Sequence, residues 1–179
     1  MSLSDIIMAE HSRAQAKMIA GIVIQKPELL DELLEIIFAE SEPLSRRAAW
    51  PLRFIHEKDE KLLPPYIPMI VSRLPNIQTI AVQRNLLYIL AYSDVPESCQ
   101  GELLQYSSEV LINRSSSVAS LIYSLDIFYN IAITEPELLN ELKLIIELLL
   151  PNATAGVRSK SIKTLKKIKR LLPFRLKKT

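Results

Sequence analysis

The sequence has very little cysteine, glycine and histidine, and each shortage excludes a class of protein. Its one cysteine, Cys99, excludes an intramolecular disulfide and a zinc site built from several cysteines. Three glycines among 179 residues are too few for a glycine-rich phosphate loop or for a turn-rich β-sandwich. Two histidines, His11 and His56, offer little for metal binding, and we interpret both as ordinary surface or boundary residues. We therefore expect no metal site and no cofactor.

Long hydrophobic runs are also missing. No window reaches the roughly 18 uninterrupted apolar residues of a membrane span; the stretch 144–150, for example, is interrupted by Glu147. The first eleven residues contain acids and lack the basic start and apolar centre of a signal peptide. These absences predict a cytoplasmic protein without a transmembrane segment.

What the sequence does contain favours helices. Leu, Ile, Ala, Glu and Lys are abundant, and all are compatible with helix. Apolar residues recur at helical spacing of three and four, as in Val118, Leu121, Ile122, Leu125, Phe128, Tyr129 and Ala132. Proline is tolerated at the start of a helix but not in its middle, and seven prolines separate the apolar segments. These are Pro27, Pro43, Pro64, Pro75, Pro96, Pro136 and Pro151.

One unit is repeated along the chain. Segment 26–37 reappears as segment 135–146, both containing Pro-Glu-Leu-Leu, at an offset that corresponds to three steps of about 36 residues. Weaker copies occur at 59–63 and 95–99. Helical runs precede these segments at 8–24, 45–56, 79–92 and 118–133, and a last run covers 158–172. The pattern predicts four helix pairs and a C-terminal capping helix in one all-α domain, 1–172, followed by a basic tail, 173–179.

This pattern resembles the α-solenoids of the HEAT and armadillo type over roughly residues 5–172. The segment Ala48-Ala49-Trp50-Pro51-Leu52 places a proline inside a helix, as the first helix of a HEAT unit often does. Segment 46–64 is similar to short bacterial HEAT-like proteins. The resemblance implies a right-handed α-α superhelix of about nine helices that binds other molecules without catalysis.

Catalytic residues are hard to find. Cys99 is expected in the first turn of a second helix, where a thiol can be activated, but no histidine is near in sequence, so a small core residue is the favoured interpretation. HEAT-like DNA glycosylases combine a basic surface with aromatics and an acid. Here Trp50 and Asp126 would be the counterparts, with Arg47, Arg53 and Arg84 as phosphate contacts, but too few aromatics accompany Asp126. We predict no enzyme.

Binding is the expected function, and we predict that the partner is another protein. The curved face made by successive second helices is one candidate surface, because repeat stacks offer long concave surfaces. If the groove instead lies on the side of the first helices, the candidate contacts are Arg46, Arg47, Arg53, Arg84 and Tyr88.

Charge is distributed unevenly along the chain. Residues 1–147 hold all 20 acids and 12 basic residues, whereas residues 148–179 hold no acid and 10 basic residues. In the last predicted helix, Ile162, Leu165, Ile168, Leu171 and Leu172 form an apolar face opposite Lys163, Lys166, Lys167 and Arg170. Three interpretations of residues 157–179 remain open. They are a solubilising cap, a contact with nucleic-acid phosphates, and a contact with an anionic membrane surface.

Overall fold

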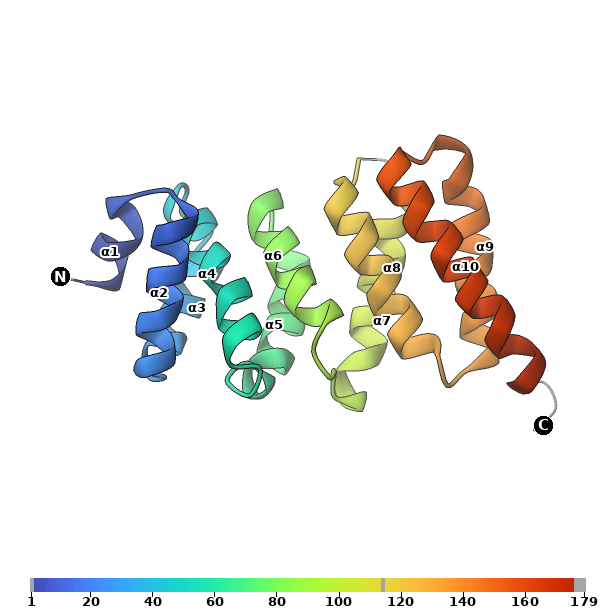
Figure 1. Ribbon diagram of the computed structural model, residues 1–179, viewed down its shortest axis with the longest axis horizontal. Helices are drawn as coiled ribbons and strands as arrows, with labels where there is room; N and C mark the ends of the chain where they lie inside the picture. The colour runs from blue at the N-terminus through green and yellow to red at the C-terminus, as the bar shows by residue number, and fades with distance from the viewer. Residues whose placement is uncertain (1, 114, 176–179) are drawn as a thin grey trace. The chain divides into compact units, whose positions relative to one another are not determined.

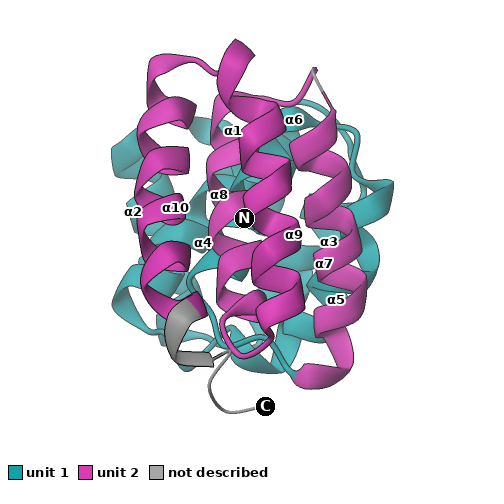
Figure 2. Ribbon diagram, turned by 90° about the vertical axis from the view of Figure 1, so that its right-hand side faces the viewer, with its two compact units in different colours: residues 1–96 teal, residues 97–179 magenta. Residues whose placement is uncertain are grey.

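The structure, a computed structural model, describes residues 2–113 and 115–175 (Figure 1). It divides into two compact units, unit 1 (residues 1–96) and unit 2 (residues 97–179), which are coloured separately in Figure 2. Within the described residues every regular element is helical, which confirms the all-α helical-repeat prediction. The α-helices of unit 1 are α1 (Leu3–Ala9), α2 (Arg13–Gln25), α3 (Leu29–Phe38), α4 (Leu44–Lys58), α5 (Ile67–Arg73) and α6 (Ile80–Ala91). Those of unit 2 are α7 (Glu97–Ile112), α8 (Val118–Ala132), α9 (Pro136–Leu149) and α10 (Ala155–Arg175).

Unit 1 has two layers of helices. The first helices of its pairs, α2, α4 and α6, pack side by side, with α2 against α4 and α4 against α6. The second helices, α3 and α5, lie behind them in Figure 1, and α3 packs against α4. The core between the layers is apolar and fully buried, for example at Ile19, Leu33, Leu52, Ile70 and Leu86.

The N-terminal helix is interrupted, so the prediction of one run over 8–24 was wrong at its start. Helix α1 ends at Ala9, and α2 begins at Arg13. The reason is a cap that sequence periodicity does not reveal. The Ser12 hydroxyl oxygen accepts a hydrogen bond from the backbone N–H of Gln15, 3.1 Å away, and so starts a new helix.

The second helix of the next pair also begins later than predicted. Segment 59–63 forms turns, and α5 starts at Ile67 after a short 3₁₀ helix at Pro64–Tyr66. Pro64 and Pro65 lack the backbone N–H groups that an α-helix starting at residue 59 would use in its second turn. Leu63, the last residue of this weaker copy of the repeat, is nevertheless fully buried.

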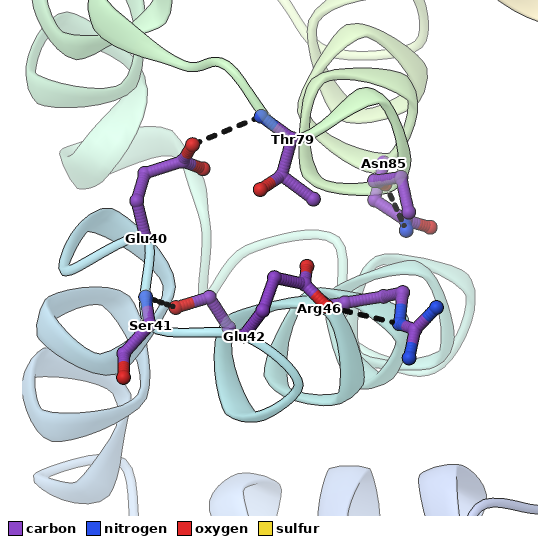
Figure 3. A network of polar contacts seen from close by, with 8 residues as sticks. Glu40, Ser41, Glu42, Arg46, Thr79 and Asn85 are labelled. Carbon is purple, nitrogen blue, oxygen red and sulfur yellow. Dashed lines mark hydrogen bonds and ion pairs between the residues drawn. The ribbon is translucent and has the colours of Figure 1, made fainter.

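The turn between α3 and α4 is tied to the start of α6 (Figure 3). Glu40 has a φ of 52°, a region that residues other than glycine rarely occupy. Its Oε2 atom accepts hydrogen bonds from the backbone N–H groups of Gln78 and Thr79, both at 2.9 Å. Two charge-assisted hydrogen bonds offset the backbone strain and fix the entry to α6.

Unit 2 repeats the two-layer arrangement. Helix α8 packs against α7, α9 and α10, and α10 lies beside α9 (Figure 2). The apolar side of α10 closes this core, because Ile168 is fully buried and Leu165, Leu171 and Leu172 pack against the cluster around Phe128 and Ile146. That contact agrees with the capping interpretation of the last helix.

One member of the predicted apolar face was wrong, since Ile162 is 42% exposed. The buried stripe instead runs through Val157, Ser161, Thr164 and Ile168.

The two Pro-Glu-Leu-Leu segments start equivalent helices, α3 and α9. Leu30 and Leu139, at matching positions, are both fully buried, and so are Leu33 and Leu142. The environments match as the repeat predicted. The predicted end of the domain at residue 172 lies inside α10, whose helical backbone reaches Arg175, and residues 176–179 lie outside the described part. A single domain over 1–172 stays a prediction.

Candidate binding faces

Charge is sorted by helix layer in each unit. In unit 1, the first helices carry one acid, Glu57, and seven basic residues, namely Arg13, Lys17, Arg46, Arg47, Arg53, Lys58 and Arg84. The second helices α3 and α5 carry Asp31, Glu32 and Glu35 against Arg73.

In unit 2 the basic residues are concentrated on one helix. Helix α10 carries eight basic residues and no acid, and α8 carries only Asp126, whereas α7 and α9 carry six acids and Lys143. First and second helices alternate along the chain, so charge counted along the sequence combines the two layers and does not reveal their difference. An anionic partner would therefore be attracted to the first helices of unit 1 and to α10.

In unit 1 the exposed side of the first helices forms what we call the unit 1 face. It consists of Arg13, Lys17, Trp50, Arg53, Arg84, Tyr88 and Tyr92. Arg84, Tyr88 and Tyr92 follow one another at spacings of four residues, so they lie in one stripe along α6 and its C-terminal cap. Exposed apolar side chains accompany the face, since Met18 on α2 is 46% exposed, Ile80 on α6 is 63% exposed and Tyr92 is 54% exposed.

The centre of the unit 1 face is a cluster of charged and aromatic groups from α4 and α6. The guanidinium of Arg53 lies 4.7 Å from the centre of the Tyr88 ring. Its Nε donates a hydrogen bond to Glu57 Oε1 at 2.8 Å, and the Tyr88 hydroxyl donates to the same oxygen at 3.4 Å. The His56 ring meets the Tyr88 ring edge-on at 6.0 Å, and the Tyr88 and Tyr92 rings are 5.0 Å apart.

These contacts shift the ionisation of the cluster. The hydrogen bond from Arg53 is the main reason why the pKa of Glu57 is lowered from its ordinary 4.5. Partial burial is the main reason why the pKa of Tyr88 is raised from its ordinary 10.0. Near neutral pH the cluster therefore holds a carboxylate, a guanidinium and a neutral phenol.

A second cluster joins α2 to α4. Arg13 and Lys17 both lie over the Phe54 ring, at 5.9 Å and 5.7 Å from its centre. The Trp50 ring packs against Phe54 and meets the exposed His11 ring edge-on at 5.7 Å. Each aromatic group thus fixes the position of a neighbouring cation or ring.

The structure brings two of the five predicted contact residues, Arg53 and Tyr88, into contact with each other. Arg46, Arg53, Arg84 and Tyr88 point to the exposed side of α4 or α6, and Arg46 forms an ion pair with Glu42 at 3.3 Å (Figure 3). Arg47 is directed elsewhere. It is partly buried, and its Nη1 donates to the backbone carbonyl oxygen of Met8 at 3.0 Å, which ties α4 to the end of α1.

The sequence analysis missed Arg13, Lys17 and Tyr92. The spacing of Arg13 and Lys17 by four residues was visible, but their aromatic partner, Phe54, lies on another helix. Tyr92 was visible only as the end of a predicted helix. Its backbone carbonyl oxygen accepts a hydrogen bond from His56 Nε2 at 3.1 Å.

In unit 2 the exposed side of α10 carries a row of cations, Lys163, Lys166 and Arg170, which we call the α10 row. Their spacings of three and four residues place them on one side of the helix, opposite the buried stripe. Within the described residues no carboxylate forms an ion pair with any of the three. Lys167, the fourth predicted contact, differs because its ammonium lies 5.0 Å over the Tyr129 ring.

Two candidate catalytic residues occupy structural positions. Asp126 forms an ion pair with Lys160, and their side chains are only 13% and 25% exposed, so its carboxylate is already engaged. This arrangement gives no support to a glycosylase-like role. Cys99 is buried at the position that Leu30 and Leu139 occupy in the other pairs, as expected of a core residue.

Neither a metal-binding cluster nor a membrane-spanning helix occurs in the described part of the chain. No group of three His, Cys, Asp or Glu side chains there is arranged to hold a metal ion. No helix in residues 2–113 or 115–175 has the length and apolar character needed to cross a membrane.

Comparison with known proteins identifies a related family. A family model described as the HEAT repeat domain matches residues 4–168. No curated protein and no solved structure matches the chain.

Proposed function

The chain belongs to the HEAT repeat domain family, and from this premise we propose that it is a non-catalytic binding module that holds a protein partner on the unit 1 face. A stack of helical repeats is a scaffold whose function lies in patches on its surface. The proposal depends on one observation. Arginines, aromatic rings and exposed apolar side chains gather on one side of α2, α4 and α6.

That composition fits a protein interface better than a merely solvated surface. Protein interfaces are enriched in Tyr, Trp, Met and Arg and depleted in Lys, Glu and Asp. The unit 1 face has Trp50, Tyr88 and Tyr92 with three arginines, and Met18 beside them. Binding energy in such interfaces is concentrated on Trp, Tyr and Arg.

The arginines are also held before any partner arrives. Arg53 is fixed by Glu57 and Tyr88, and Arg13 by the Phe54 ring. Side chains that are already ordered lose less conformational entropy on binding. The basic layer further favours a partner with an acidic surface. The second helices offer less, because they expose mainly carboxylates in unit 1.

Site-specific photo-crosslinking in the source cells tests the proposal. A photoreactive amino acid replaces Met18 beside the unit 1 face or, as the control, Glu32 on the exposed side of α3. We expect one protein to be captured from position 18 and not from position 32. With that protein purified, Arg53→Ala with Arg84→Ala should weaken binding about 10- to 100-fold, as expected when two anchor side chains are truncated. Equal capture from both positions, or unchanged affinity of the double variant, would refute the assignment of this face.

A further inference from the structure

We propose that the α10 row is a second, separate binding element that holds the phosphate backbone of a duplex nucleic acid without reading its sequence. The inference is independent of the proposed function, because it concerns another unit and another class of partner. It begins with the side chains that α10 leaves exposed. Between Arg158 and Arg170 the helix exposes Lys163, Lys166, Lys167, Lys169 and both arginines, and its sequence contains no acid.

Capping explains only half of this helix. The need to cover the core of unit 2 accounts for Ile168 and Leu165, which pack against α8 and α9. Capping does not explain why the exposed charges are all positive, because acidic and basic side chains both keep a surface soluble. Helices α7 and α9 of the same unit carry six acids between them, so acids are plentiful there. Their exclusion from α10 indicates an anionic partner.

The structure disfavours a membrane as that partner. Helices that bind in the plane of a membrane insert an apolar face between the lipids. In α10 that face is already used, since Ile168 is fully buried and Leu165, Leu171 and Leu172 pack in the core cluster. Among residues 155–172, Ile162 is the one large apolar residue in the exposed class, and it is 42% exposed.

A duplex fits better than a single strand. Proteins that bind single strands stack bases on aromatic rings, and residues 155–172 contain none. The α10 row spans about 10 Å along the helix axis, and a duplex presents one charge per about 1.7 Å of its axis. The two lysines and one arginine of the row share one side of the helix, so each can meet a phosphate as a charge.

Fluorescence anisotropy with a labelled 25-base-pair duplex, as DNA and as RNA, tests the inference on the full chain. Point substitutions are needed, because deleting α10 would remove Val157 and Ile168 from the core. The triple variant Lys163→Gln, Lys166→Gln and Arg170→Gln should lower affinity on the order of 10- to 100-fold near 100 mM salt. The dependence of log K on log salt should become shallower by about 0.9 for each phosphate that the variant no longer neutralises.

A control variant of equal charge distinguishes binding at the α10 row from attraction by the net charge of the protein. Lys26→Gln, Lys58→Gln and Lys61→Gln remove the same charge from exposed positions outside both faces, and should leave duplex affinity within about twofold. Equal loss of affinity in both triple variants would overturn the inference, because it would mean that net charge alone attracts the duplex. Failure of the wild-type chain to bind duplex at 50 mM salt would also overturn it. Stronger binding to phosphatidylserine vesicles, or displacement of the duplex by polyglutamate at equal charge, would assign the row to a membrane or an acidic protein. Crosslinking from position 18 should be unaffected by the α10 variant, so the two proposals fail separately.

Discussion

The unit 1 face and the α10 row are both built on first helices and both are basic, yet they hold their cations differently. On the unit 1 face, Arg53 lies between a carboxylate and an aromatic ring, and Arg13 and Lys17 lie over Phe54. On α10, the cations of the row extend from a straight helix without an acidic partner among the described residues.

The difference teaches how one fold can present two kinds of recognition. Cations fixed by neighbouring rings and carboxylates suit a partner of defined shape, because position and direction are set in advance. Lysines on long, flexible side chains suit a diffuse array of negative charge, where no single geometry is required. The repeat architecture supplies the helices, and the residues on their exposed sides determine the chemistry.

We expect the largest effect, on the free energy of unfolding, when a cation of α10 that supports the structure is removed, and little effect when a cation available for binding is removed. Lys160→Ala leaves the largely buried Asp126 carboxylate without its ion-pair partner, and we expect a loss of about 1–3 kcal/mol in the free energy of unfolding. Lys166→Ala, six residues further along the same helix, should change stability by less than about 0.5 kcal/mol. Chemical denaturation measures both variants.

Duplex affinity should show the opposite order, with Lys166→Ala weakening binding more than Lys160→Ala. If Lys160→Ala were stable but failed to bind duplex, the distinction between supporting and contacting cations on α10 would be wrong.

Exchanging arginine and lysine sharpens the comparison further. Arg53→Lys with Arg84→Lys keeps the charge of the unit 1 face but removes the planar group that stacks on Tyr88. We expect partner affinity to fall roughly tenfold, or about 1.4 kcal/mol. Lys163→Arg with Lys166→Arg should leave duplex affinity within about twofold, because either side chain meets a phosphate as a charge.

Isothermal titration of the purified partner and anisotropy of the labelled duplex provide the two readouts. If the exchange to lysine on the unit 1 face changed affinity as little as the exchange to arginine on the α10 row, both surfaces would bind by charge alone.

Sequence periodicity was sufficient for the fold, because burial in stacked helices follows spacing. Leu30 and Leu139 occupy the same position of the repeated Pro-Glu-Leu-Leu segment, and both are fully buried. Helix boundaries were less predictable. They depend on the Ser12 cap and on the missing N–H groups of Pro64 and Pro65, which override the apolar pattern.

The binding faces were only partly predictable, because they depend on direction and on contacts between helices. Arg46 and Arg47 are neighbours of the same type in sequence, but adjacent helix positions point about 100° apart. One is exposed beside Glu42, and the other bonds to the end of α1. The difference in charge between the two layers becomes apparent only when each helix has been assigned to a layer, and the order of residues along the chain does not give that assignment.

The smallest expected effect concerns pH and Glu57. The hydrogen bond from Arg53 lowers the pKa of this carboxyl in the folded chain below its ordinary 4.5, so folding favours the ionised form. The stabilisation is therefore fully present above the ordinary pKa and is lost as the pH falls through the lowered one. Because the pair is exposed, Glu57→Gln should lower the free energy of unfolding by less than about 1 kcal/mol at pH 7, and this difference from the wild type should vanish in acid.

Denaturation curves between pH 7 and pH 3 measure this difference, with Lys166→Gln as a control whose difference from the wild type stays constant. A Glu57→Gln difference that did not change with pH would mean that Arg53 is held by the Tyr88 ring alone, and the unit 1 face would then resemble the α10 row more than its geometry indicates.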